Sequence, residues 1–463
     1  MLFNSYDFIF LYLPVVVIVY FYLGQKHSPK WASAWMVLVS LFFYGYWDWR
    51  YVPLLLASMG FNYFVGQKIQ SAASRRLWLY FGVLTDLALL GYFKYAAFFL
   101  KTVNDVAGTM VFDVPHIVLP LGISFFTFTQ IAYLVDTYRC ETKSGGFLSY
   151  AEFVTIFPHL IAGPILNHKK MIPQFLHWEN YAVNWDNIAR GLALFLMGLF
   201  KKACIADGLA GWINELFGKI HGLTCYEAWL GAIGYTFQLY FDFSAYSEMA
   251  VGLALIFNFR FPTNFDSPYQ ASNIIDFWRR WHMSLGAWVK EYLYIPMGGG
   301  RNGAVLKMRN LLVSMLLIGF WHGAGWTFIV WGALHGLYLV INHLWRQAGL
   351  SLPKVISWPL TFLAVTVAWV FFRADSLTDA CSMISVMLYG RAISWNAAMS
   401  SSLGVCSRLV LGTGIALALF PNPQRLLERY FSFNVRWLAL LFILSAGSFY
   451  AFSHISDFLY FQF

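Results

Sequence analysis

Long apolar runs, separated by short polar or basic stretches, follow one another along almost the whole chain. A membrane-spanning helix needs about 20 predominantly apolar residues. The runs that approach this length predict helices over roughly 8–25, 33–50, 52–66, 78–100, 117–138, 188–209, 228–257, 310–321, 325–346, 356–373, 405–421 and 435–455. Segments 150–165 and 277–296 are expected to be re-entrant or interfacial pieces. The pattern predicts an all-α, polytopic membrane protein with about 11 to 13 helices, forming one domain over residues 1–463.

Residues 277–296 show a helical rather than an irregular pattern. Their apolar stripe at three- and four-residue steps consists of Trp278, Trp281, Leu285, Trp288 and Tyr292. Arg279, Arg280, Lys290 and Glu291 lie off this stripe. The pattern predicts one helix lying in the plane of the membrane interface with its aromatic side down. The following GGGRNG (298–303), with Arg301, predicts a flexible basic turn on the cytoplasmic side.

Composition agrees with a membrane location. The chain has 463 residues, of which 59% are hydrophobic and 11% charged, whereas a soluble domain carries about 25% charged residues. The net charge of +9 does not indicate nucleic-acid binding, because the basic residues form short clusters between apolar runs, at 68–76, 169–170, 201–202 and 279–309. This placement is typical of cytoplasmic loops. The five cysteines have neither ligand nor disulfide-framework spacing.

Two histidines are the candidates for chemistry, because ionisable residues inside membrane segments usually serve a function. Between Leu311 and Asn342 the only acidic or basic side chains are His322, in GFWHGAGW, and His335, in WGALHGLY. The alternative is a pair of packed core histidines. On one straight helix, a separation of 13 residues would turn the two side chains in nearly opposite directions. This geometry excludes a shared metal ion unless the glycines after His322 redirect the chain.

His322 is therefore the better catalytic candidate, and His335 is expected to position or to pack. A neutral, buried imidazole can act as a general base toward an attacking hydroxyl. Asp242, in QLYFDFSAYSEM, is a further charge within an apolar run, and it is expected either to orient a histidine or to hold a helix junction. The sequence contains no GxSxG, P-loop or HExxH motif. A transporter or flippase without covalent chemistry, or a scaffold of a polysaccharide export complex, remains the alternative.

Eight segments in a characteristic order resemble the membrane-bound O-acyltransferase family, and within it the bacterial branch that acetylates alginate or other exopolysaccharides. They are LGYFKYAAFF (90–99), LPLGISFFTF (119–128), FPHLIAGPIL (157–166), QLYFDFSAYSEMAVGLAL (238–255), FRFPTNFDSPYQ (259–270), DFWRRWHMSLGAWVKEYLYIPMGGGRNG (276–303), FWHGAGWTFIVWGALHG (320–336) and FLYFQF (458–463). The resemblance covers most of the chain, with a core over roughly 90–346.

The resemblance implies a ring of tilted helices around a through-membrane tunnel. It places the family's invariant histidine on His322. It places a second catalytic position, expected to assist by hydrogen bonding, on His282 in RRWHMS. It implies acetyl transfer from cytoplasmic acetyl-CoA across the bacterial inner membrane, for O-acetylation of alginate, cellulose or another exopolysaccharide. The implied partners are a periplasmic acetyltransferase, the polysaccharide synthesis and export complex and membrane lipid. No bound cofactor is implied, because acetyl-CoA is a substrate.

Two positions depart from the family pattern. FDFSAYSEM has Ala245 and Glu248 where the family usually has Gly and Asp, and PMGGGR (296–301) lacks the family's Asn. A hydrophilic insertion associated with alginate members before the last helix is also absent, which leaves a cellulose or other exopolysaccharide system open. The phosphates of acetyl-CoA are expected near the basic loop, at Arg279, Arg280, Lys290 or Arg301.

Overall fold

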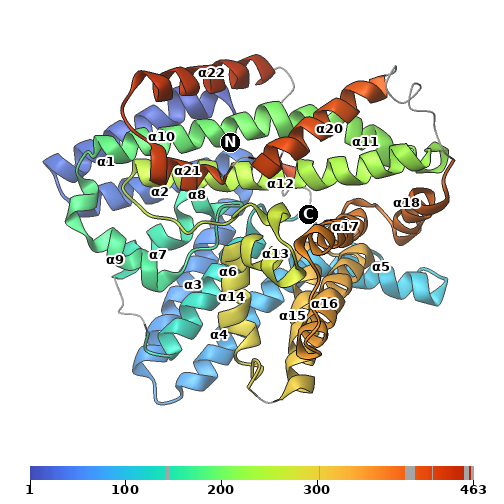
Figure 1. Cartoon of the computed structure of the whole chain (residues 1–463). Coiled ribbons are helices and arrows are strands. Elements are labelled where there is room, and N and C mark those ends of the chain that lie inside the picture. Colours follow the sequence, from blue (N-terminus) through green and yellow to red (C-terminus); the bar gives the residue numbers. More distant parts are fainter. Residues whose placement is uncertain (142–145, 302, 392–401, 420, 453–457, 460–463) are drawn as a thin grey trace. The chain divides into compact units, whose positions relative to one another are not determined.

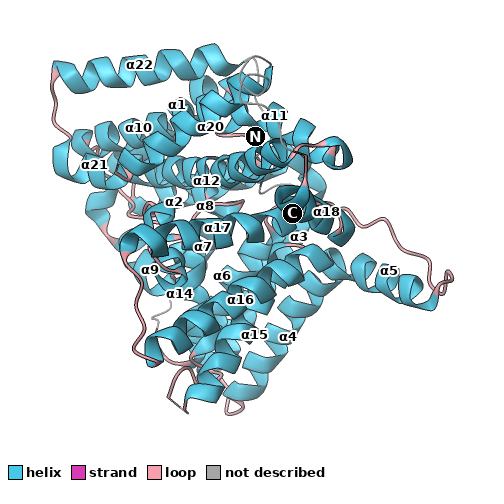
Figure 2. Ribbon diagram, turned by 45° about the vertical axis from the view of Figure 1, so that its right-hand side comes forward, coloured by secondary structure: helices cyan, strands magenta, loops and turns pink. Residues whose placement is uncertain are grey.

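The computed structural model is built of helices in the part of the chain that it describes: residues 1–141, 146–301, 303–391, 402–419, 421–452 and 458–459. No strand occurs in these ranges, and Figure 2 shows helices joined by loops. The predicted all-α class is confirmed. Of the segments with a family resemblance, residues 460–463 and Asn302 lie outside the described residues.

Five helical segments of the described chain are long and apolar enough to cross a membrane. They are Asp7–Lys26, Arg75–Ala107, Ala304–His322, Trp326–Gln347 and Lys354–Arg373. Shorter apolar helices cover Leu377–Tyr389, Gly404–Leu417 and Val435–Ala451. Several such helices indicate a multi-pass membrane protein, as predicted. The total of about 11 to 13 membrane helices stays a prediction.

Helix boundaries differ from the prediction at several places, of which two have a clear local cause. The run predicted over 117–138 becomes helical only at Ile123, because Gly122 has a φ of 72° and Pro120 precedes it. Proline restricts the backbone of its neighbour, and a left-handed glycine cannot continue an α-helix. The helix Leu377–Tyr389 was not predicted at all. Its N-terminus is set by Ser376, whose hydroxyl accepts a hydrogen bond from the Asp379 amide at 3.0 Å.

The chain divides into two compact units. The first comprises Met1–Phe195 and Ser247–Pro262, and the second comprises Leu196–Tyr246 and Thr263–Phe463. Helices of the first unit, labelled in Figure 1, are η1 Asp7–Tyr12, α1 Leu13–Lys26, α2 Pro29–Asp48, η2 Trp49–Tyr51, α3 Val52–Ser71, α4 Arg75–Leu90, η3 Gly91–Tyr95, α5 Ala96–Ala107, α6 Ile123–Tyr138, α7 Gly146–Thr155, α8 Phe157–Leu160, α9 His168–Leu176, η4 Trp178–Tyr181 and most of α10 Trp185–Phe200.

The helices of the second unit follow in chain order. They are η5 Lys201–Ala206, α11 Asp207–Gly218, η6 Ile220–Gly222, most of α12 Cys225–Ile256, η7 Pro268–Gln270, α13 Ile274–Arg280, α14 Met283–Val289, η8 Lys290–Tyr294, α15 Ala304–His322, α16 Trp326–Gln347, α17 Lys354–Arg373, α18 Leu377–Tyr389, α20 Ser402–Leu419, α21 Pro423–Tyr430 and α22 Val435–Ala451.

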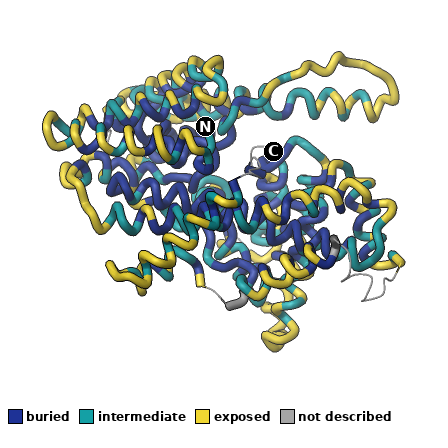
Figure 3. Tube along the Cα trace, turned by 90° about the horizontal axis from the view of Figure 1, so that it is seen from above, coloured by how far each residue is buried: buried dark blue, intermediate teal, exposed yellow. Residues whose placement is uncertain are grey.

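The first unit packs α1 against α2, and α3, α4 and α6 against one another. A buried polar network joins the last three helices. The Asn62 amide donates to Asp86 at 2.8 Å and to Gln130 at 2.6 Å, and the Ser58 hydroxyl donates to Gln130 at 2.7 Å. Buried polar groups need such partners because they have lost water. Figure 3 shows buried and exposed stretches alternating along the helices, as expected where one face packs and the other does not.

In the second unit, α15 and α16 form an antiparallel pair that lies side by side in Figure 1. Their backbones approach closely at two glycines. A methyl group on Gly332 would lie 2.5 Å from the carbonyl oxygen of Met315, and one on Gly319 would lie 3.0 Å from the Cα of Gly332. Small residues permit this kind of approach between membrane helices. The glycine contact therefore fixes where the end of α15 lies relative to α16.

Candidate active site

His322 is the last residue of α15. The chain after it is extended, with a φ of −160° at Gly323 and −161° at Gly325, and α16 begins at Trp326. The predicted glycine break is therefore present. Any side chain at Gly323 would collide with the Phe328 ring. The break thus places an imidazole at the junction of two packed helices, with 5% of its surface exposed.

Aromatic rings from three helices surround His322. The ring centroids of Trp321, Trp331 and Phe372 lie 5.0, 5.2 and 5.2 Å from that of His322. These rings belong to α15, α16 and α17, and the interplanar angle to Trp331 is 90°. Edge-to-face contacts of this kind hold a ring in one orientation without charging it. The imidazole accordingly sits in a dry, rigid setting that suits a neutral base.

His335 lies on the other side of the same indole. The ring centroid of Trp331 is 4.9 Å from that of His335. The Trp278 Nε1–H group donates to Nδ1 of His335 at 3.3 Å, and the His335 side chain is fully buried. Its Nε2 has no hydrogen-bond partner among the described residues. His322 and His335 are thus separated by Trp331 rather than joined in a common ligand set. A positioning or packing role of His335 stays a prediction.

His282 occupies a left-handed turn between α13 and α14, with φ 44° and ψ 54°. The prediction of one continuous interfacial helix over 277–296 is therefore wrong. The apolar stripe gave no sign of the break, because Trp281 and Leu285 are both buried, as a single helix would also require. A non-glycine residue adopts this conformation only when its surroundings compensate the cost.

Asn264 supplies that compensation. Its side-chain oxygen accepts hydrogen bonds from the Ser284 hydroxyl at 2.8 Å, from the Ser284 amide at 3.2 Å and from Nδ1 of His282 at 3.1 Å. The backbone carbonyl of Asn264 accepts from the Met283 amide at 2.8 Å. Burial lowers the pKa of His282 to about 3. The imidazole of His282 is therefore neutral near neutral pH, and its Nδ1–H donates to Asn264.

Trp321 connects the two predicted catalytic histidines. Its ring centroid lies 6.4 Å from that of His282 and 5.0 Å from that of His322. The second unit therefore gathers both histidines around one indole, although they are separated by 40 residues in the sequence. Phe243 of α12 also contacts His282 edge to face, with ring centroids 4.8 Å apart. The catalytic roles of the two histidines stay predictions.

Asp242 makes contacts that favour the second of its two predicted roles. Its carboxylate accepts from Nζ of Lys202 at 2.8 Å and from the Leu459 amide at 3.0 Å. Lys202 also donates to Asp207 at 2.8 Å. These bonds tie α12 to η5, α11 and residue 459, so Asp242 holds a helix junction.

The ion pairs around Lys202 show that one prediction made from the charge pattern is wrong. Lys201 and Lys202 were predicted to lie in a cytoplasmic loop, but both are buried within η5. Carboxylates at positions 207 and 242 compensate the buried ammonium of Lys202. The sequence carries a signal for this arrangement, because Asp242 is a lone charge in an apolar run and a buried charge needs a partner.

The residues predicted to bind acetyl-CoA phosphates differ in their surroundings. Arg279, Lys290 and Arg301 have exposed side chains. Arg280 is half-buried and forms an ion pair with Asp276, Nε to Oδ1 3.0 Å, which reduces its capacity to bind an added anion. A phosphate role stays a prediction for all four residues.

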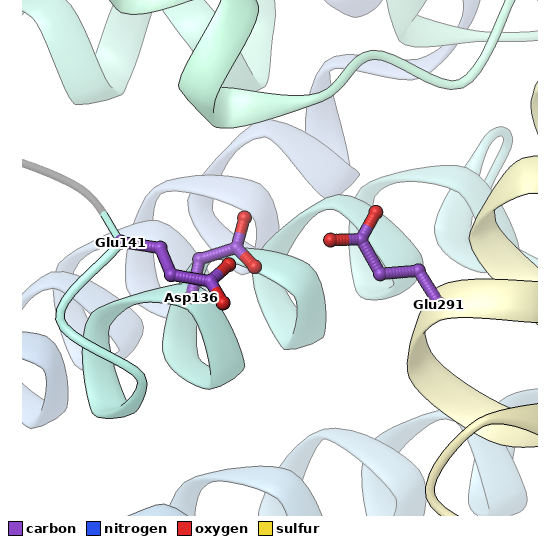
Figure 4. A group of neighbouring side chains, drawn as sticks. All are labelled: Asp136, Glu141 and Glu291. Atoms are coloured by element: carbon purple, nitrogen blue, oxygen red, sulfur yellow. The ribbon is translucent and has the colours of Figure 1, made fainter.

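Asp136 and Glu141 form an acidic pair in the first unit (Figure 4). Asp136 lies in the last turn of α6 and Glu141 follows the helix. The Lys169 ammonium forms ion pairs with both carboxylates, at 3.3 Å from Asp136. A shared cation of this kind offsets the repulsion between two neighbouring carboxylates.

The sequence pattern missed three residues that shape the site. Trp331 and Phe372 appeared only as members of apolar runs, and Asn264 appeared as one polar residue in a loop. The tryptophan content gave no means of selecting Trp331 in particular. Asn264 carried no such signal either, because its burial in a segment without regular structure becomes evident only in the structure.

Comparisons with known proteins place these features in a wider context. Residues 17–378 match the sequence profile of the membrane-bound O-acyltransferase family. The peptidoglycan O-acetyltransferase of Helicobacter pylori is 45% identical over 421 residues, which cover 84% of this chain and 80% of that protein. The probable alginate O-acetylase AlgI of Pseudomonas aeruginosa is 43% identical over 399 residues, covering 84% and 75%. The teichoic acid D-alanyltransferase of Bacillus subtilis is 28% identical over 281 residues, covering 56% and 68%.

Proposed function

Because the chain belongs to the membrane-bound O-acyltransferase family, we propose that it transfers acetyl groups to the hydroxyls of a bacterial cell-envelope polysaccharide. The donor is cytoplasmic acetyl-CoA, the enzyme lies in the inner membrane, and the acetyl group crosses the membrane region through the predicted tunnel. Membership of an O-acyltransferase family agrees with the enzyme class expected from the sequence.

The placement of His322 is the observation that carries this proposal. The imidazole stands at the break between two packed apolar helices, with aromatic rings on three sides. Such surroundings exclude water, which would otherwise hydrolyse a thioester. An imidazole in its neutral form can accept a proton in this setting.

The chemistry balances without any further reactant. The acceptor hydroxyl gives its proton to His322 while its oxygen attacks the thioester carbonyl carbon. The tetrahedral intermediate then breaks the carbon–sulfur bond, and the imidazolium of His322 returns the proton to the leaving thiolate. The products are an O-acetyl ester and coenzyme A. His282 acts as a positioning residue, since its ring contacts Trp321, which in turn contacts His322.

The names of the relatives support a polysaccharide acceptor. One is named for the O-acetylation of peptidoglycan and another for that of alginate. Both names describe ester formation on a glycan, so the class of acceptor is better supported than any single polymer. Alginate, cellulose and peptidoglycan are the polymers to test first. A periplasmic acetyltransferase and a polysaccharide export complex are the proposed partners.

The proposal is tested with purified protein and radiolabelled acetyl-CoA. We expect the wild-type protein to release coenzyme A and to form a labelled O-acetyl product with a glycan acceptor. The His322→Gln variant should lose at least about 100-fold of this rate, the lower range for loss of a general base. His177→Gln serves as the matched control, because His177 is an exposed histidine of the first unit. Size-exclusion profiles establish that both variants fold.

Three results would contradict the proposal in whole or in part. If His322→Gln folds and retains the wild-type rate, His322 is not the base. If the wild-type protein forms no labelled product but moves a glycan or lipid-linked sugar across vesicles, the transporter or flippase alternative holds. Dependence of acetylation in cells on the protein but not on His322 would favour a scaffold.

A further inference from the structure

A groove of about 510 Å³ lies in the second unit between the C-terminal half of α16 and the N-terminal half of α17. Because these helices are antiparallel and joined at 348–353, residues near this loop line one end of the groove. Arg346 and Ser351 lie at this end, whereas Tyr338 and Ala364 lie deeper. Eight helical residues separate Tyr338 from Arg346, which corresponds to about 12 Å along the axis.

Apolar side chains form most of the groove wall, at the loop end as well as deeper, with Trp345, Leu352 and Leu360 among them. Uncharged polar groups such as Asn342 and Ser351 interrupt this wall, and Arg346 is the one charged residue that lines it. No acidic side chain lines the groove. Arg346 is exposed, and its guanidinium forms no hydrogen bond or ion pair with the described residues. An exposed cation thus stands at the mouth of a mainly apolar groove.

Further positive charge lies beside Arg346. Nζ of Lys307 is 3.2 Å from Nδ1 of His343, and the charges of Arg279, Lys307 and Arg346 all act on the His343 ring. All of these residues belong to the second unit. The loop end of α16 therefore concentrates cations, which is the distribution expected on the cytoplasmic side of a membrane protein.

We propose that this groove binds an anionic phospholipid of the surrounding membrane. The phosphate lies at Arg346 and Asn342, and one acyl chain follows Ile341, Leu360 and Ala364 away from the loop. Charge complementarity selects an anion, and the apolar walls select an amphiphile over a soluble phosphate. Both flanking helices are long and apolar enough to cross a membrane, so lipid is the solvent on their outer faces.

Lipid binding is measured on the purified full-length protein by native mass spectrometry, with phosphatidylglycerol and phosphatidylcholine of identical acyl chains as probes. We expect phosphatidylglycerol to be retained more strongly. Arg346→Gln should weaken its binding about fivefold, since each basic residue near an anionic lipid surface contributes about 1 kcal/mol. Ala364→Phe should weaken the binding of both lipids, because its ring would occupy the path of the acyl chain.

Arg436→Gln is the matched control. Arg436 is an exposed arginine in the first turn of α22 and is not one of the residues that line the groove, so its replacement should leave lipid binding unchanged. Equal retention of phosphatidylglycerol by wild type, Arg346→Gln and Ala364→Phe would overturn the proposal. If coenzyme A displaced phosphatidylglycerol from the wild-type protein but not from Arg346→Gln, the groove would be assigned to a soluble nucleotide instead. None of these readouts depends on acetyl transfer, so they are independent of the proposed function.

Discussion

Replacing Gly332 by alanine tests the backbone contact between α15 and α16. A methyl group at this position would lie 2.5 Å from the Met315 carbonyl oxygen and 3.2 Å from the Cα of Gly319. Ordinary non-bonded contacts between heavy atoms lie near about 3.5 Å. The helices must therefore separate locally by roughly 1 Å, because backbone atoms cannot rotate away as a flexible side chain can.

Gly332→Ala is expected to have two effects, one on stability and one on the catalytic rate. Overpacking of a tight contact destabilises by about 1–3 kcal/mol. Separation of the helices also displaces His322 relative to Trp331, since these residues belong to α15 and α16 respectively. A misplacement of about 1 Å lowers a catalytic rate by about 100-fold. Gly332→Ala should therefore lower acetyl transfer more than its loss of stability explains.

The assay compares the melting temperature of the purified protein with its rate of coenzyme A release from acetyl-CoA. Gly211→Ala is the matched control, because Gly211 lies in α11 of the same unit and a methyl group there meets no atom within 4 Å. This control should stabilise slightly, by up to about 1 kcal/mol, through helix propensity. If Gly332→Ala kept both wild-type values, the reasoning from the glycine contact would be refuted.

Three further predictions concern the polar groups of the second unit. Lys202→Met should destabilise the protein by about 3–5 kcal/mol, because it leaves buried carboxylates uncompensated. Adding Asp242→Asn to this variant should restore part of the yield of folded protein, and an unchanged yield would contradict the ion-pair role. Asn264→Ala should cost about 1–3 kcal/mol for each donor left unsatisfied, seen as a lower melting temperature, whereas Asn264→Asp, which keeps the acceptor for Ser284, should cost less. Burial lowers the pKa of His282 to about 3 in the folded protein, whereas the unfolded chain keeps the ordinary histidine pKa of about 6.5. Between about pH 6.5 and about pH 3 the unfolded chain therefore binds one more proton than the folded chain, so the free energy of unfolding falls as pH falls through this range. At pH 5, His282→Gln should remove about 2 kcal/mol of this pH-dependent loss of stability. The prediction is refuted if the melting temperatures of wild type and variant depend on pH in the same way.

The sequence was informative where a single physical cause dominates. Long apolar runs became helices because a buried or lipid-facing backbone must satisfy its own hydrogen bonds. The break after His322 followed from its two nearby glycines. The position of His322 at a helix end was predictable for the same reason.

Features that depend on distant contacts were not predictable. The turn at His282 interrupts an apolar stripe of ideal helical spacing, because Asn264 offers hydrogen bonds that a continuous helix would lose. The burial of Lys202 was predictable only in part: the lone charge of Asp242 required a partner, but the sequence did not identify Lys202 as that partner or Asp207 as the second carboxylate. In the same way, Trp331 acquires its place between two histidines only through the packing of α16 against α15 and α17.

The bond between Asp242 and the Leu459 amide has a consequence for biosynthesis. It joins residues 217 positions apart, so the ribosome completes α12 long before the second partner exists. Until then, the Asp242 carboxylate has Lys202 as its ion-pair partner, and Lys202 is shared with the carboxylate of Asp207. A chain whose translation has not reached residue 459 therefore lacks one donor to the Asp242 carboxylate, and this is a chemical difference between unfinished and finished chains.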